Sequence, residues 1–178
     1  MRFFLALFLL ALAAASYFLV PGVSHNQEQN YADDAIAVVK MVATTNKMYA
    51  LDYHGQWTSG PLDNACNSAQ CTAAARGGEA PACNLVSCNY LSHQDWETKK
   101  YNFYSLNPTA KPSTTNACGT FQAAYPWVAC AIRKTAADGD RSAPKYSAGW
   151  GYAVSEDGAL VGSVQAGGAA AVPLPELK

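Results

Sequence analysis

The stretch DDAIAVVKMVATTNKMYALDYHG, residues 33–55, determines the fold. Small and apolar residues recur in it at steps of three and four, the spacing of one face of an α-helix. That face consists of Ala35, Val38, Val39, Val42, Thr45, Asn46, Tyr49 and Tyr53. Asp33 and Asp34 suit the positive end of the helix dipole, and Gly55 can end the helix in a left-handed cap. We therefore expect an amphipathic helix from about Asp33, or earlier, to His54.

An uncharged apolar run precedes this helix. It extends from Phe3 to Val20 and follows a single basic residue, Arg2. As a helix the run would reach about 27 Å, close to the hydrocarbon thickness of a bilayer. It could be a signal peptide cleaved near Ala13-Ala14-Ala15, or an uncleaved anchor whose helix ends at Pro21-Gly22. In either case Arg2 favours a cytoplasmic N-terminus and export of the remaining chain.

The composition excludes several classes of protein. A chain of 178 residues favours one domain with appendages, and 50% hydrophobic residues exclude global disorder. The formal net charge is −1, from 12 basic and 13 acidic residues without a basic run. Nucleic-acid binding and attachment through a polybasic patch are therefore not expected.

All six cysteines lie within residues 66–130. They are Cys66, Cys71, Cys83, Cys88, Cys118 and Cys130. In an exported protein an even number of cysteines indicates disulfides. Two pairs with four intervening residues superficially resemble zinc ligands, but zinc sites usually use tighter pairs. The spacing does not choose a connectivity. We favour pairing within residues 66–88 and a separate bridge between Cys118 and Cys130.

The rest of the chain divides into an irregular part and a strand-rich part. Residues 56–96 are rich in Asn, Ser, Ala and Gly, and a loop of this length is expected in a compact domain only if it is cross-linked. Aromatic and β-branched residues then predict strands at 101–104 and 127–132, and a hairpin formed by 150–154 and 160–164.

The predicted architecture is α+β. A long N-terminal helix packs on a small antiparallel β-sheet, beside a disulfide-stapled loop region. We divide the chain into an apolar signal or anchor segment, 1–22, an α+β domain, 23–166, and a flexible tail, 167–178. Within the domain the helix occupies about 33–54, the cysteine-rich loop 56–96 and the sheet 100–164.

This pattern resembles the type IV pilin and pseudopilin superfamily. An apolar run, a proline near its end, an amphipathic helix and a Tyr-x3-Tyr pair before a glycine occur in the family's order. The matching residues are Phe3 to Val20, Pro21, Ala35, Ile36, Val39, Val42, Thr44, Tyr49, Tyr53 and Gly55. The segments Lys100–Phe103, Ala124–Pro126 and Gly149–Gly158 are similar to the strand-and-hairpin end of many pilin-like proteins.

The resemblance implies a pilin-like fold and a non-enzymatic role in a type IV pilus or a type II secretion-like filament. Its partners would be other pilin-like subunits or copies of itself, with the inner membrane bound through residues 3–20 if these are not cleaved. The protein would then belong to the bacterial cell envelope. The stem and assembly residues would be Phe3, Leu7, Leu10, Pro21, Ile36, Val39, Val42, Tyr49 and Tyr53.

The chain departs from the family's usual pattern at its start. It shows no basic leader ending in Gly or Ala ahead of a Phe or Met, and no acidic residue before Glu28. We therefore expect a tip or accessory subunit, a pilin-like protein with an ordinary signal peptide, or a reading frame that begins upstream of Met1. The alternative function is a secreted, disulfide-containing binding protein whose first 15 or so residues are removed.

No catalytic constellation can be named, so we expect neither an enzyme nor a cofactor. The sequence lacks a Gly-x-Ser-x-Gly elbow, and Gly149-x-Gly151 lies in a strand pattern rather than before a helix. The His93-x-Asp95-x-Glu97 group fits a solvated loop better than a site.

Weak candidates for calcium ligands are Asp138, Asp140, Glu156 and Asp157, although Asp-Gly is also a common sequence in turns.

The many aromatic residues could form an adhesive or carbohydrate-binding surface, but in a small domain we expect them to fill the core.

Overall fold

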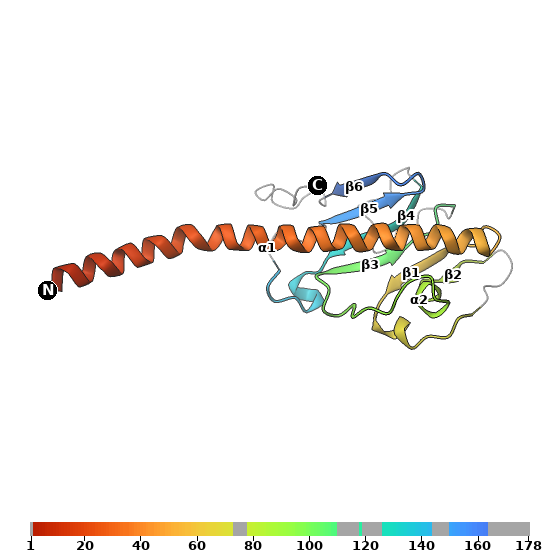
Figure 1. Cartoon of the computed structure of the whole chain (residues 1–178), viewed down its shortest axis with the longest axis horizontal. Helices are drawn as coiled ribbons and strands as arrows, with labels where there is room; N and C mark the ends of the chain where they lie inside the picture. The colour runs from red at the N-terminus through yellow and green to blue at the C-terminus, as the bar shows by residue number, and fades with distance from the viewer. Residues whose placement is uncertain (1, 73–77, 110–117, 119–125, 144–149, 164–178) are drawn as a thin grey trace.

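One long helix and a six-stranded sheet make up the fold (Figure 1). The structure is a computed structural model that describes residues 2–72, 78–109, 118, 126–143 and 150–163, with the backbone alone for 2–26 and 163. The α+β class predicted from the sequence is confirmed. The predicted tail, 167–178, lies outside the described residues.

A single helix, α1, extends from Arg2 to Asp52. For an uncleaved anchor the sequence predicted a helix end at Pro21-Gly22, which is wrong because α1 continues through these residues. The amphipathic helix was expected from about Asp33 or earlier, and the structure shows the earlier start. Once a helix is nucleated, each added residue contributes its own hydrogen bond, so a long helix tolerates the one donor that a proline removes. Residues 23–30 show no apolar period because the buried apolar side of the helix begins only at Ala32.

The predicted glycine cap at the end of α1 is confirmed. The backbone of Gly55 has a φ of +86° and its N–H donates to the carbonyl of Ala50 at 2.7 Å. His54 also has a positive φ, +56°. Because a left-handed residue cannot continue a right-handed helix, α1 ends at Asp52 and not at His54.

The sheet has the order β2-β1-β3-β4-β5-β6. Its strands are β1 (Thr58–Leu62), β2 (Ala80–Pro81), β3 (Tyr101–Ser105), β4 (Trp127–Arg133), β5 (Gly151–Ser155) and β6 (Leu160–Ser163). The last four agree with the strands predicted from the sequence. β1 pairs with β2 in parallel and every other described pair is antiparallel, so the sheet is mixed and not purely antiparallel.

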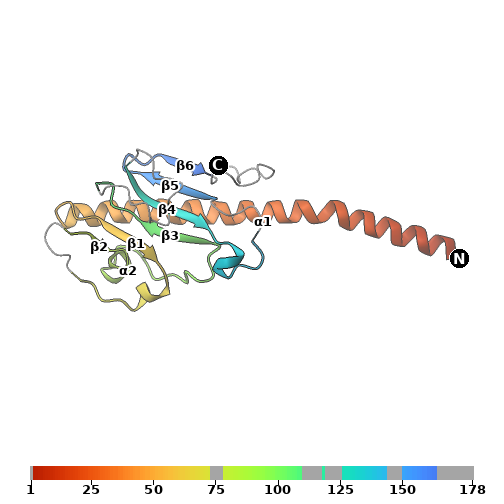
Figure 2. The ribbon, with the colours of Figure 1, turned by 180° about the vertical axis from the view of Figure 1, so that it is seen from behind.

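The second half of α1 lies across one face of the sheet, over β3, β4 and β5 (Figures 1 and 2). Buried residues of α1, including Ala35, Val39 and Val42, pack there against buried residues of the strands. The expectation that aromatic residues fill the core is confirmed for Tyr49, Trp96, Tyr101, Phe103, Trp150 and Tyr152, each of which is at most 3% exposed.

One polar side chain, Asn46, crosses the interface between helix and sheet. Its amide nitrogen donates to the carbonyls of Leu106 and Val128, both at 3.0 Å, and of Thr58 at 3.4 Å. Its carbonyl oxygen accepts from the backbone N–H and the hydroxyl of Thr58, at 3.0 and 2.9 Å. Asn46 is fully buried, so this single amide fixes the axial position of α1 over the ends of β1, β3 and β4.

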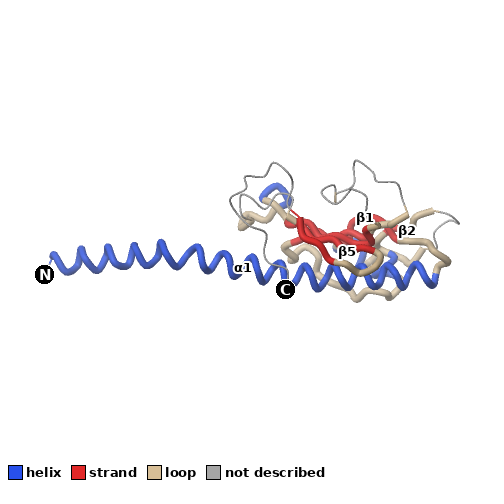
Figure 3. The backbone as a smooth tube through the Cα atoms, turned by 90° about the horizontal axis from the view of Figure 1, so that it is seen from above, coloured by secondary structure: helices blue, strands red, loops and turns tan. Residues whose placement is uncertain are grey.

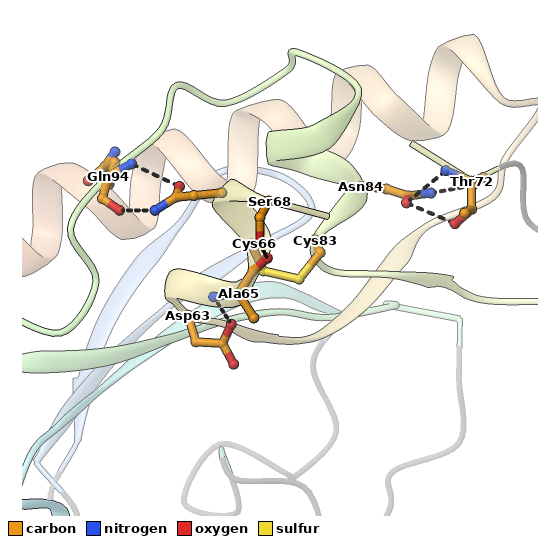
Figure 4. The surroundings of a disulfide bond; sticks show 9 residues. Asp63, Ala65, Cys66, Ser68, Thr72, Cys83, Asn84 and Gln94 are labelled. Carbon is orange, nitrogen blue, oxygen red and sulfur yellow. Dashed lines mark hydrogen bonds between the residues drawn. A yellow bond between two sulfur atoms is a disulfide. The ribbon is translucent and has the colours of Figure 1, made fainter. Parts of the chain in front are cut away.

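Two disulfides hold the irregular region between β1 and β3. Cys66 pairs with Cys83 and Cys71 with Cys88, in agreement with the pairing favoured from the sequence. The region contains two short helices that were not predicted from the sequence, η1 (Asn64–Asn67) and α2 (Asn84–Ser87). Cys66 lies in η1, and Cys83 and Cys88 flank α2. Figure 4 shows the Cys66–Cys83 bridge joining these two elements.

Amide side chains add to these cross-links. Asn84 is fully buried and its amide donates to the hydroxyl of Tyr49 on α1 at 2.9 Å and to the carbonyl of Thr72 at 2.6 Å. Asn67 and Gln94 exchange hydrogen bonds at 2.8 and 3.3 Å (Figure 4). The loop is therefore attached both to itself and to α1.

The third disulfide, Cys118–Cys130, joins β4 to a residue outside the strands. Both cysteines are buried and, with Ala153, form a small second cluster. Its partly buried neighbours are Tyr104, Leu106, Trp127, Ile132 and Val161. These side chains alternate along β3, β4 and β6 with those that contact α1, so this cluster covers the opposite face of the sheet.

We expect Asn46→Ala to lower the free energy of unfolding by about 2–4 kcal/mol, because it leaves buried carbonyls and an N–H without partners. Urea unfolding followed by tryptophan fluorescence measures this. Thr44→Ala is the matched control, since the exposed Thr44 hydroxyl bonds only to the carbonyl of Lys40 in its own helix. Equal loss in both variants would contradict the role assigned to Asn46.

Candidate assembly surface and stem junction

The helix α1 has two parts with different surroundings. From Ala32 onward, one side of it is buried against the sheet. The part before residue 27 extends beyond the sheet as a free-standing rod (Figures 1 and 3). We call residues 2–26 the stem and the remainder of the described chain the head. The apolar run 3–20 is thus carried on a helix that the head does not cover.

Exposed apolar residues lie on the side of α1 that faces away from the sheet. Met41, Met48 and Leu51 are 39%, 52% and 81% exposed, and they are the large hydrophobic residues exposed in the part of the chain that the structure describes. With the exposed Ala37 and Thr44 they follow alternating steps of four and three residues, which places them on one line along the helix. We call these five residues the outer stripe.

The stem joins the head at a buried arginine. Arg133, the last residue of β4, is fully buried and its guanidinium binds Glu28 of α1 through Nε and Nη2, at 3.0 and 2.9 Å. Its Nη1 donates to Asp140 at 2.6 Å and to the carbonyls of Lys100 and Lys134 at 3.0 and 2.9 Å. Every side of the guanidinium therefore has an acceptor, as a buried charge requires.

A second cation and an aromatic ring complete this stem junction. Lys100 donates to Asp140 at 2.9 Å, so one carboxylate serves both cations. The ring of Tyr31, on α1, lies 5.7 Å from Arg133 and 5.6 Å from Lys100. Two cations and two carboxylates are thus gathered at the point where α1 leaves the head. The electrostatic contacts fix the direction of the stem because Glu28 and Tyr31 both belong to the helix.

Protonation at the junction follows from its packing. Burial alone would raise the pKa of Asp140, but hydrogen bonds from Ser142, Arg133 and Lys100 outweigh it and hold that pKa below its usual range. Burial raises the pKa of the neighbouring Tyr152 to about 12. Asp140 therefore stays ionised and Tyr152 stays neutral at physiological pH.

The sequence-predicted stem residues fall into two groups. The side chains of Phe3, Leu7, Leu10 and Pro21 lie outside the described residues, and so does the anchor prediction for 3–20. Among residues whose side chains are described, no helix is long and apolar enough to cross a membrane. Ile36, Val39, Val42 and Tyr49 are buried inside the head, and Tyr53 is half-buried against it. These five residues thus pack α1 within the head, and the outer stripe is the exposed apolar side of the described part of α1.

The predicted calcium ligands are not brought together. Asp138 and Asp140 follow β4, whereas Glu156 and Asp157 lie in the turn after β5, and the antiparallel register places these pairs at opposite ends of β4. Asp138 accepts hydrogen bonds from the backbone and hydroxyl of Thr135, both at 2.8 Å. Asp157 accepts from the Ser155 hydroxyl and the Ala159 N–H. Their oxygens thus serve local turns.

No other described metal or catalytic group stands out. The one cluster with metal-ligand spacing among the described residues is Asp63, Cys66 and Cys83, and its two sulfurs form a disulfide. His93, Asp95 and Glu97 lie exposed in a loop, where Asp95 accepts from Asn64 at 3.3 Å.

The stem junction was not predicted from the sequence, although the residue pattern of β4 indicates it. Arg133 has the same parity along the strand as Ala129 and Ala131, which face α1. A charged residue on the core face of a strand requires a carboxylate partner, and Glu28 is the acidic residue that a helix beginning before Asp33 would supply. The assumed helix start removed that partner from consideration.

Comparisons of the chain with protein-family models, with characterised proteins and with solved structures find no match.

We expect Asp140→Asn to destabilise the protein by about 1–3 kcal/mol at pH 7. Because the pKa of Asp140 is lowered by folding, its contribution is present above the pKa of the unfolded chain, about 3.9, and is lost as the pH falls below that value. The difference between wild type and variant should therefore shrink below about pH 4. Urea unfolding at a series of pH values measures this.

The control for this experiment is Asp34→Asn, since Asp34 is half-exposed and pairs only with Lys99 at the surface. Its effect should stay within about 0.5 kcal/mol. A difference for Asp140→Asn that does not change between pH 7 and pH 3 would contradict the assignment.

Proposed function

We propose that this chain is a non-enzymatic, pilin-like subunit or accessory component of a filament in the bacterial cell envelope. The observation that carries the proposal is the single continuous helix Arg2–Asp52, of which the head covers only the second half. Apolar residues at 3–20 on an uncovered helix need a lipid or protein environment, because exposed apolar surface of that extent is unfavourable in water.

The outer stripe supports packing between copies. Its residues are small or flexible and apolar, except Thr44, and they run along α1 in line with the stem. Helices associate through such stripes when side chains of one fit between those of the other. A neighbouring helix laid along the stem would therefore continue along the head without meeting the sheet.

Three disulfides indicate that the head matures in an oxidising compartment, which agrees with export. In the proposed arrangement the stem inserts in the inner membrane before assembly. The rigid junction at Arg133 then holds the head at a fixed angle to the stem, as a regular filament requires.

The first experiment determines the N-terminal residue of the mature protein by mass spectrometry. Retention of the run 3–20, together with recovery in membrane or sheared-filament fractions, is the expected result. A start near Ser16 would leave too little apolar length for an anchor. That outcome would overturn the proposal in favour of a secreted binding protein with the same head.

The second experiment tests the outer stripe. We expect Met48→Lys combined with Leu51→Lys to reduce the yield of filaments at least about tenfold, because two charges would be buried between helices. The midpoint of thermal unfolding should stay within about 2 °C, since both side chains are exposed in the subunit.

The matched control is Thr98→Lys, an exposed position in the loop before β3. A photo-crosslinking residue at position 48 should also give dimers of the chain, whereas one at position 98 should not. Filament yields that are the same in all variants would show that the outer stripe is not an assembly surface.

A further inference from the structure

A hollow of about 530 Å³ lies beside the last residue of α1, Asp52. In Figure 1 this end of α1 lies at the end of the head opposite the stem. The volume of the hollow is within the range of about 300–1,000 Å³ that is typical of small-molecule sites. It is lined by the residues that follow α1, by Gly78 and Glu79 ahead of β2, and by Asn107 and Thr109 after β3. Three separate chain segments thus meet there, none of which takes part in the outer stripe or the stem junction.

Two aromatic side chains form part of the wall. The ring of Tyr53 stacks on that of the buried Tyr49, with 4.2 Å between centroids and 15° between planes. A further edge contact with Tyr90, 6.4 Å between centroids, holds Tyr53 in one orientation, and the side chain remains half-exposed at the hollow. Trp57 is also half-buried and packs against the main core. Proteins commonly bind organic cations against the faces of aromatic rings, because the π-electrons of the ring attract the positive charge.

The described lining of the hollow carries negative charge. Its described lining contains two carboxylates, Asp52 and Glu79, and neither Lys nor Arg. The C-terminal end of α1, which carries a partial negative charge, lies at the same place. Glu79 is held by Asn107, whose amide donates to it at 3.1 Å, and Asp52 accepts from the hydroxyl of Tyr90 at 2.6 Å.

Tyr90 does not neutralise this charge. Its hydrogen bond to Asp52 raises the pKa of the Tyr90 phenol to about 12, so the proton stays on Tyr90 and the negative charge on Asp52. A ligand that enters the hollow therefore meets two fixed carboxylates beside two aromatic rings. A positively charged organic group has favourable contacts with both kinds of side chain.

We propose that this hollow binds a small organic cation that carries a quaternary ammonium group, with Tyr53 and Trp57 as ring contacts and Asp52 and Glu79 as counter-ions. A bare metal ion fits less well, because Asp52 and Glu79 are not among the described groups whose ligand atoms converge. A quaternary ammonium needs no hydrogen-bond acceptor and is weakly hydrated, so rings and nearby charges suffice. This proposal is independent of whether the chain forms filaments.

The test uses the full-length protein in a maltoside detergent, which has no ammonium group. Choline is added, and its methyl signal is followed by saturation-transfer NMR. The neutral control is 3,3-dimethylbutan-1-ol, in which carbon replaces the nitrogen of choline. We expect a signal and saturable binding for choline and none for the alcohol. Equal binding of the two compounds, or of neither, would overturn the proposal.

Matched variants locate the site. Glu79→Gln removes one charge without changing shape, and it should weaken choline binding by at least about fivefold. Glu97→Gln, at an exposed position outside the hollow, should leave binding unchanged. Trp57→Leu should abolish the signal, whereas Trp57→Phe, which restores a ring, should recover part of it.

Thermal unfolding of each variant shows whether it is folded, so that a loss of binding with an unchanged midpoint supports the site. Binding that survives both Glu79→Gln and Trp57→Leu would overturn it. Vesicles of phosphatidylcholine, compared with vesicles of phosphatidylglycerol, then distinguish a lipid headgroup from a free cation as the source of the ammonium group.

Discussion

The architecture depends on a mismatch between one helix and the sheet that buries it. At about 1.5 Å per residue, α1 is roughly 77 Å long, whereas its longest partner, β4, has seven residues and reaches roughly 23 Å. The sheet can cover only part of the helix. In the proposed filament, the apolar residues of the stem are buried against lipid or against neighbouring subunits.

Because burial of an apolar face is not directional, it does not by itself fix where along α1 the sheet sits. Two polar contacts do so. Asn46 binds backbone groups at one end of the sheet, and Glu28 binds Arg133 at the other. Each would leave buried polar atoms unpaired if the helix moved by one turn. The position of the stem relative to the head is therefore defined at two points separated by 18 residues of helix.

Local patterns were sufficient to predict the α1 face, its glycine cap and strands β3 to β6. They also predicted that the cysteines of residues 66–88 pair with one another, but not which of them are partners. β1 was missed because TSGPL contains a glycine and a proline and has little strand propensity of its own. It forms a strand because Gly60, Pro61 and Leu62 pair with β3, a contact between distant parts of the chain. The polar residues 23–31 were not assigned to the helix from their pattern, because a helix without a buried side shows no period.

The candidate sites were harder to predict for the same reason. Arg133, Glu28 and Asp140 come from a strand, a helix and a loop, and nothing in their local sequence relates them. Of the residues nominated from the pilin resemblance, the five from Ile36 to Tyr53 are packed within the head, because the core-facing side of α1 is also its most regular side. The residues of the outer stripe, on the opposite side of α1, are less uniformly apolar, and they make up more of the surface that a partner could contact.

The two disulfides of the irregular region have a consequence for biogenesis. Cys66–Cys83 and Cys71–Cys88 close loops of the same span, 17 residues. The two native loops interleave along the chain. The nested alternative, Cys66–Cys88 with Cys71–Cys83, lengthens one loop and shortens the other by the same number of residues. Since closure entropy varies only with the logarithm of loop length, the two connectivities cost nearly the same. Loop-closure entropy therefore does not favour the native pairing before the core of the head has formed. If the nested pairing forms first, thiol–disulfide exchange is needed to reach the native pairing, in which Cys66 is buried in the core.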